Sequence, residues 1–142
     1  MPILKYTTEV SVEKSMGEVI GALTRRGVTR ISTLFNDEGA PAGIAFTMKT
    51  EYGYREFQLP VRTAGVLRAM TADPKVARSQ CNEKQAARVA WRIAKTWLEA
   101  QAALIDAELA SLDEVMLPYM VNAKGQTAYS LMREGAMKEL ER

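Results

Sequence analysis

The fold is decided by residues 44–61, which read IAFTMKTEYGYREFQLPV. Ile44, Phe46 and Met48 alternate with Ala45, Thr47 and Lys49, as in a strand with one buried face. Glu51-Tyr52-Gly53 is a turn, and Phe57, Leu59 and Val61 then share one side of a second strand over Tyr54–Val61, in which Pro60 marks an edge or the strand's end. A short turn between consecutive strands predicts an antiparallel pair.

The residues before this pair extend the sheet and add a helix. Val28–Phe35 is rich in β-formers, and residues 36–39 (Asn-Asp-Glu-Gly) predict a turn, so the sheet becomes a meander. Ser11 is the expected N-cap of a helix that ends at Gly27. Its apolar stripe is Met16, Val19, Ile20 and Leu23, which we expect to pack on the sheet. Tyr6–Val10 is a candidate fourth strand at the edge.

The residues after the sheet predict a helical half. Residues 62–82 remain undecided between helix and loop. A long helix is expected from about Glu83 to about Ala110, with one stripe of Ala86, Ala90, Ile93, Trp97, Ala100 and Leu104 and a second of Trp91, Ala94, Leu98, Ala102 and Ile105. Either the chain sandwiches both stripes or one is buried against another copy.

The C-terminal residues predict two more helices. Ser111 and Glu114 form a capping box for a short helix, which Pro118 ends or kinks. Residues 122–125 predict a turn, and the last helix carries Leu131, Met132, Ala136 and Leu140. The expectation is a single α+β domain over residues 1–142: a small antiparallel meander of three to four strands packed by an N-terminal helix, followed by a long helix and a helical C-terminal region.

Charge is sorted by position along the chain. The net charge is only +2, yet the bases from residue 62 to 95 are Arg62, Arg68, Lys75, Arg78, Lys84, Arg88, Arg92 and Lys95, against Asp73 and Glu83. Residues 96–121 carry Glu99, Asp106, Glu108, Asp113 and Glu114 and no base. A basic segment of this kind suits a polyanion, most commonly nucleic acid.

The long helix is the centre of the predicted site. Arg88, Arg92 and Lys95 share one helical face with Lys84 one turn earlier, and Lys75 and Arg78 precede them. Two alternatives remain open. This face is only solvated, or its bases pair with the acidic helix around Asp113 and Glu114, in the same chain or in another copy.

The second strand turn adds aromatic and basic residues. Tyr52, Tyr54 and Arg55 lie at its tip with Lys49 across from them, a combination that suits stacked bases and phosphates of a single strand. Arg30 is expected on the same outer sheet face, beside Thr47, Glu56 and Gln58. The alternative is that the tyrosines are ordinary cross-strand fillers.

Composition narrows the possible chemistry. The chain has no histidine, which excludes Ser-His-Asp or Cys-His catalysis and zinc sites built on Cys and His. The single Cys81 allows no intrachain disulfide, which fits a reducing cytoplasm. No catalytic residue, metal ligand or cofactor site is predicted, and no stretch is long and apolar enough for a bilayer.

Several short motifs resemble small proteins encoded by tailed bacteriophages and prophages. They are Thr7-Thr8, Val10-Ser11-Val12-Glu13-Lys14-Ser15, Gly27, Phe57-x-Leu59-Pro60, Ala90-Trp91-Arg92, Glu114-x-x-Leu117-Pro118 and Gly125-x-Thr127. The resemblance spans most of the chain apart from residues 63–82. It implies a phage protein acting in the host bacterial cytoplasm, beside replication or recombination genes, and it supplies no catalytic residues.

The leading hypothesis is therefore a non-enzymatic phage protein that binds nucleic acid, preferably single-stranded DNA, as a homo-oligomer. The alternative is a phage inhibitor or adaptor that binds a host protein, steered by its separated charges. A nuclease that uses scattered carboxylates and a metal ion is a third hypothesis, which no spacing supports.

Overall fold

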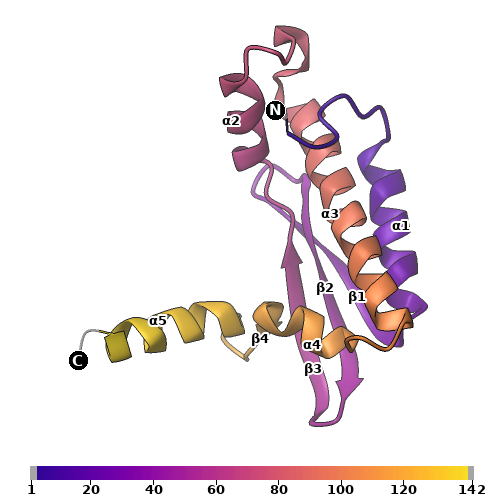
Figure 1. Cartoon of the computed structure of the whole chain (residues 1–142), viewed down its shortest axis with the longest axis vertical. Coiled ribbons are helices and arrows are strands. Elements are labelled where there is room, and N and C mark those ends of the chain that lie inside the picture. The colour runs from indigo at the N-terminus through magenta and orange to yellow at the C-terminus, as the bar shows by residue number, and fades with distance from the viewer. Residues whose placement is uncertain (1–2, 141–142) are drawn as a thin grey trace.

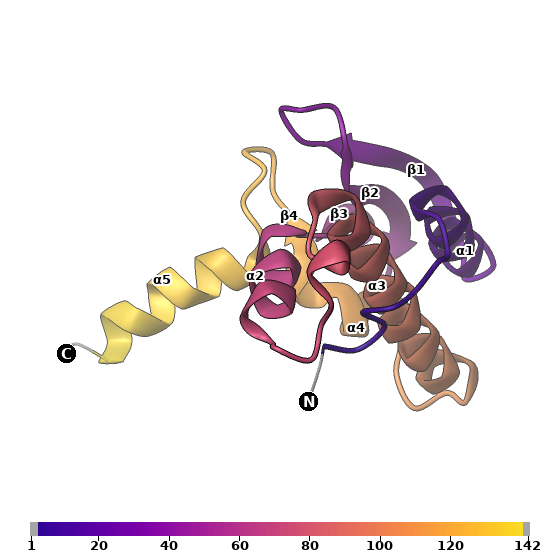
Figure 2. The same cartoon turned by 90° about the horizontal axis from the view of Figure 1, so that it is seen from above.

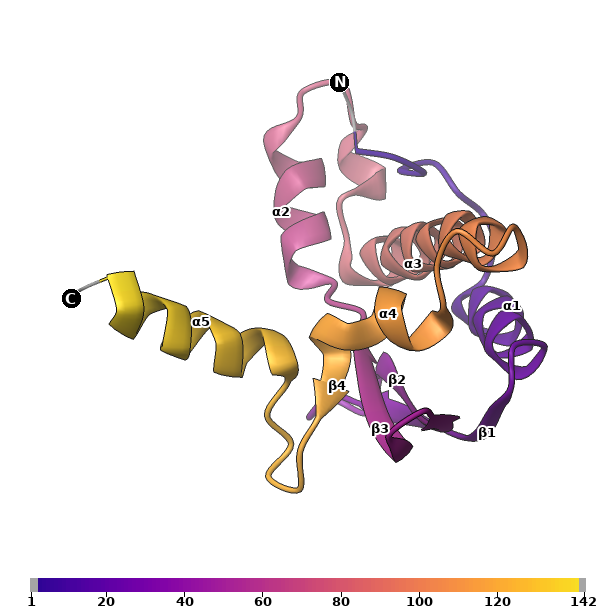
Figure 3. The same cartoon turned by 60° about the horizontal axis from the view of Figure 1, so that its bottom comes forward.

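The computed structural model describes residues 3–140, with side chains up to residue 135. An antiparallel sheet forms one layer, and helices on one of its faces form the other (Figures 1 and 3). The predicted α+β class, with an N-terminal helix, a long helix and a helical C-terminal region, is confirmed. The elements in chain order are α1 (Val12–Thr24), β1 (Val28–Phe35), β2 (Pro41–Thr50), β3 (Gly53–Pro60), α2 (Ala64–Ala72), η1 (Arg78–Gln80), α3 (Glu83–Asp106), α4 (Leu112–Met116), η2 (Leu117–Tyr119), β4 (Met120–Val121) and α5 (Ala128–Leu140), where η marks a single 3-10 turn.

The sheet is a meander in the order β1-β2-β3-β4, all antiparallel. The first three strands and both turns lie where the sequence predicts them. The fourth strand is not Tyr6–Val10, so that expectation is wrong; Met120–Val121 pairs with Glu56 and Phe57 instead.

The N-terminal segment lies on α3, and its backbone groups are paired there. Gln85 of α3 is buried and its Nε2 donates to the carbonyl oxygens of Tyr6 and Thr8, at 3.2 Å and 2.9 Å. A side chain thus satisfies carbonyl groups that an edge strand would have paired with a neighbouring strand.

The core lies between the sheet and the helices. Ile44, Phe46, Phe57 and Leu59 face the helices, and the rings of Phe46 and Phe57 stack with centroids 5.2 Å apart. Trp91 of α3 has no exposed surface, and its indole N–H donates to the carbonyl of Pro41 at 3.3 Å. These side chains join α3 to the middle of the sheet.

Helix α1 begins at the predicted cap and packs along α3. The Ser11 hydroxyl accepts from the backbone N–H of Lys14 at 3.1 Å. Val19 and Leu23 are buried, as their stripe predicts, but α1 makes more of its contacts with α3 than with the sheet (Figure 3). One long face of α3 is therefore covered by another helix, which matters for the predicted site.

The chain itself covers most of both stripes of α3. Trp91, Leu98 and Ala102 are buried toward the sheet, and Ala86 and Ala90 are buried at the end near α2. The remaining part of the first stripe is more open. There Trp97 is half-buried with its ring edge-to-face against Tyr119, and Ala100 and Leu104 are exposed.

The undecided segment is mostly ordered structure. Residues 64–72 form α2, and Met70 and Val76 pack with Ala86 and Val89 into a small second core. The capping box of Ser111 and Glu114 is present at α4. Helix α5 forms as expected; of its apolar stripe, the side chains of Ala136 and Leu140 lie outside the described residues.

Candidate nucleic-acid interface

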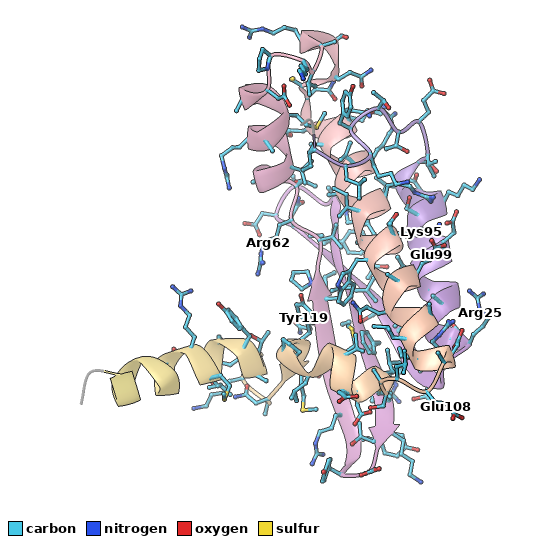
Figure 4. The ribbon with its side chains drawn as sticks, viewed as in Figure 1. Arg25, Arg62, Lys95, Glu99, Glu108 and Tyr119 are labelled. Carbon is cyan, nitrogen blue, oxygen red and sulfur yellow. The ribbon has the colours of Figure 1, made fainter. Side chains whose placement is uncertain are left out.

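Two cations of the predicted site on α3 face α1 and form ion pairs there. Glu18 of α1 accepts from Arg92 Nη2 at 3.1 Å and lies 3.2 Å from Lys95 Nζ. Glu99 pairs with Lys95 from the next turn of α3, and Figure 4 shows both side chains between the two helices. Arg92 Nε also donates to the hydroxyl of the fully buried Ser15, at 3.2 Å. We call Ser15, Glu18, Arg92, Lys95 and Glu99 the polar seam.

The polar seam changes the titration of Lys95. The hydrogen bond to Glu99 raises the pKa of Lys95 above its usual 10.5, partial burial lowers it, and the bond to Glu18 raises it again. The net shift is upward. The pairing of protonated Lys95 therefore stabilises the folded state. Its contribution to folding stability is complete below pH 10.5 and is lost as the pH rises through the raised pKa.

The expected open cationic face on α3 is therefore wrong at Arg92 and Lys95. The side chains of these residues are only 11% and 18% exposed. The alternative, that these bases pair with carboxylates of the same chain, is correct for Arg92 and Lys95. Their partners, however, are Glu18 and Glu99 rather than Asp113 and Glu114. Arg88 is half-buried and its Nη1 donates to Gln85 Oε1 at 3.0 Å. The spacing of the bases placed them on one face of α3, but the sequence did not show that α1 covers it.

Breaking the polar seam is expected to lower stability. Glu18→Gln leaves Arg92 and Lys95 without their shared carboxylate, and because the seam is only partly buried we expect a loss of about 1–2 kcal/mol in the free energy of unfolding. Urea denaturation measures this loss. Glu51→Gln, the same change at an exposed turn residue, is the control. An equal loss in both variants would contradict the role of the seam.

The outer face of the sheet carries another part of the predicted site. Residues directly opposite each other in an antiparallel pair share a face. The register aligns Arg30 with Thr47 and Thr47 with Glu56, and it aligns Lys49 with Tyr54. These five residues lie on the face opposite the helices, and no helix of residues 3–140 covers that face (Figure 3).

The β2–β3 turn exposes two aromatic rings. Tyr52 is 75% exposed in the turn itself, and Tyr54 is 63% exposed at the start of β3. Gly53 between them has φ +97°, a left-handed conformation that glycine adopts without strain. Arg55 lies on the other face of β3, and its Nη1 donates to the Tyr54 carbonyl at 3.0 Å. The outer face and turn together, called the sheet surface below, are Arg30, Lys49, Tyr52 and Tyr54, with Arg55 at the margin.

The remaining predicted cations lie at the far end of the molecule. Lys75, Arg78 and Lys84 are exposed around η1 and the start of α3. Arg62 and Arg68 are also exposed beside α2; they belong to the same basic segment but are not among the predicted site residues. Figure 4 shows Arg62 directed outward. We call these five residues the basic end.

The predicted site is thus divided into three parts. The η1 turn and the start of α3, which carry Lys75, Arg78 and Lys84 of the basic end, lie at the opposite end of the long axis from the β2–β3 turn (Figure 1), and the polar seam lies within the helical layer. No ion pair involves the cations of the basic end or the sheet surface within the part of the chain whose side chains are described. Two exposed surfaces therefore remain to bind an anion.

Comparison with models of protein families, with curated proteins and with solved structures finds no match for this chain. Among residues 3–140, no helix combines the length and apolar character needed to cross a membrane. Among the side chains that the structure describes, up to residue 135, no three His, Cys, Asp or Glu side chains gather in a way that would hold a metal ion.

Proposed function

We propose that this chain is a non-enzymatic nucleic-acid-binding protein that prefers single strands and binds them on the sheet surface. The observation that carries the proposal is the pairing of Lys49 with Tyr54 on the uncovered sheet face, with the ring of Tyr52 exposed beside them. Aromatic rings with nearby cations suit a single strand because every base has a face that can stack while its phosphates meet positive charge.

The sheet surface alone carries little net charge. Arg30, Lys49 and Arg55 are balanced in part by Glu51 and Glu56. The basic end, with five exposed cations against Asp73 and Glu83, is the stronger electrostatic region. We therefore assign stacking to the sheet surface and additional phosphate contacts to the basic end, with little preference among bases.

The biological setting belongs to the same proposal. The resemblance to proteins of tailed bacteriophages and prophages supports a role in phage DNA replication or recombination, in the cytoplasm of the host bacterium. Single-stranded DNA is the form of nucleic acid exposed in both processes, so we propose it as the ligand. We further propose that the protein acts as a homo-oligomer.

The test is a titration of fluorescein-labelled oligo(dT) at two salt concentrations. Binding is expected at low salt and is expected to weaken steeply as salt is added, since cations released from the strand make affinity salt-dependent. Absence of binding at low salt would end the proposal.

The basic end can be tested separately by its salt dependence. Lys75→Gln, Arg78→Gln and Lys84→Gln are each expected to reduce the slope of log affinity against log salt by about 0.7, the value for one phosphate contact on a single strand. Arg25→Gln is the matched control, because Arg25 is an exposed cation directed away from the basic end (Figure 4). A slope that changes as much for Arg25→Gln as for the other three would remove the basic end from the interface.

The alternative function is a phage inhibitor or adaptor that binds a host protein. The separation of charge favours it, because the basic end surrounds α2 and η1. Glu108 (Figure 4) and helix α4, which carries Asp113 and Glu114 (Figure 1), lie near the other end of α3. Opposite charges at two ends would orient a charged protein partner. One host protein recovered in stoichiometric amount, without nucleic acid, would favour this alternative.

A further inference from the structure

Helix α5 leaves the body of the molecule with apolar side chains in water. In Figures 1, 2 and 3 it points away from the layer formed by α1 and α3, and its main contact with another element is with η2. Tyr129, Leu131 and Met132 are 61%, 43% and 70% exposed. Three large apolar side chains within about one helical turn form a surface that usually has a partner.

The same chain also has a groove with an apolar interior, which suits apolar side chains such as those exposed on α5. Its volume is about 950 Å³, and its walls come from the start of α1, the β1–β2 turn, β2, α2 and the start of α3. Ala42, Val61, Leu67 and Ala86 supply apolar surface inside it. Such a volume is at the upper end of the range for small-molecule pockets, so it accommodates several side chains.

The rim of the groove is mainly acidic. Glu13, Glu38 and Glu83 line it from three different elements, against Arg68 alone. Within the described side chains none of these three carboxylates has an ion-pair partner. Arg133 lies one helical turn after Tyr129 on α5, whereas Glu134 lies on the other side of the helix, so an arm that inserts Tyr129 and Met132 would bring a cation to this rim.

We propose that the groove is occupied by α5 of a second copy of this chain, and that two copies exchange these helices reciprocally. Every residue that lines the groove precedes Arg88, and α5 of the same chain projects away from it. Each copy carries one projecting helix and one groove. In a two-fold arrangement each α5 therefore docks in the groove of the other copy, no helix or groove is left unoccupied, and the assembly closes as a dimer. The exchange buries apolar surface that the monomer leaves in water.

Two variants with opposite defects test the exchange in the full-length chain. The arm variant, Leu131→Asp with Met132→Asp, replaces exposed side chains on α5 and keeps the groove. The groove variant, Ala64→Arg with Thr71→Arg, changes exposed residues of α2 that line the groove and keeps the arm. The new guanidinium groups can reach the rim carboxylates while their methylene stems cover the apolar floor.

Light scattering during size-exclusion chromatography gives the readout. The wild-type chain is expected to be a dimer, and each variant alone is expected to be a monomer with an unchanged circular dichroism spectrum. An equimolar mixture of the two variants is expected to form a dimer again, because the intact arm of one fits the intact groove of the other. This mixed dimer has one docked arm, so it dissociates at a higher concentration than the wild type.

Leu109→Asp is the matched control, since Leu109 is 72% exposed after the end of α3 and outside the groove, and it is expected to leave the dimer intact. A monomeric wild type, a dimeric arm variant, or a mixture that stays monomeric would each overturn the proposal. If a host protein fills the groove instead of a second copy, the purified wild-type chain would be monomeric, which also overturns the proposal. The arm variant leaves the sheet surface and the basic end unchanged, so it is still expected to bind oligo(dT) as a monomer. Failure of one proposal is therefore distinguishable from failure of the other.

Discussion

Replacing both Tyr52 and Tyr54 with alanine is expected to weaken oligo(dT) binding by at least about 30-fold. Each stacked base contributes about 1–3 kcal/mol, and 1.4 kcal/mol corresponds to a tenfold change in affinity. The rings are 75% and 63% exposed, so their removal takes little from the core. Fluorescence anisotropy measures the loss, and thermal unfolding of the double variant is expected to match the wild type.

Phenylalanine at both positions separates stacking from other roles of these residues. Tyr52→Phe with Tyr54→Phe keeps both rings and removes only the hydroxyl groups, so binding within about threefold of the wild type is expected from a stacking interface. If the phenylalanine variant loses as much affinity as the alanine variant, the hydroxyl groups carry the interaction. If the alanine variant binds as well as the wild type, the β2–β3 turn is outside the interface.

Trp91→Ala is expected to have the largest effect on stability, about 3–5 kcal/mol in the free energy of unfolding. Trp91 has no exposed surface and lies where α3 meets the sheet. Its loss leaves a cavity, and it removes the indole N–H that is paired with the carbonyl of Pro41. Urea denaturation of the variant measures the change through its midpoint and slope.

Trp97→Ala is the matched control for this substitution. Trp97 lies on the same helix but is only half-buried, against Tyr119 and the side of α2. We expect a smaller loss than for Trp91, because water and neighbouring side chains can fill part of the space. A loss at Trp97 equal to or greater than that at Trp91 would show that the core is not centred on the contact between α3 and the sheet.

Much of the fold was predictable because its signals are local. The alternation around Phe46 and Phe57 specifies strands, and the Ser11 cap with Gly27 marks the limits of α1. The error at Tyr6–Val10 has a tertiary cause. A segment rich in β-formers pairs as a strand only if a sheet edge is available, and here its carbonyl groups accept from Gln85. No feature of the sequence near Tyr6 indicates that Gln85, nearly eighty residues later, donates to these carbonyl groups.

The candidate site was predictable only in part, for a similar reason. Period-two alternation placed Arg30 and Lys49 on one sheet face, and the register agrees. Helical spacing placed Arg92 and Lys95 on one face of α3, also correctly. Spacing along one helix contains no information about the helix beside it, so the contact with Glu18 was not predictable.

The sequence by itself determined the elements of this protein: the capped first helix, the meander and the long amphipathic helix, since caps, turns and apolar periodicity act over a few residues. The tertiary structure alone decided which charges stay in water. By packing α1 along α3 it joined Glu18 to cations more than seventy residues away and left the basic end and the sheet surface exposed. Whether a charged side chain stays exposed or is paired depends on which surfaces meet, and that depends on the packing of whole elements.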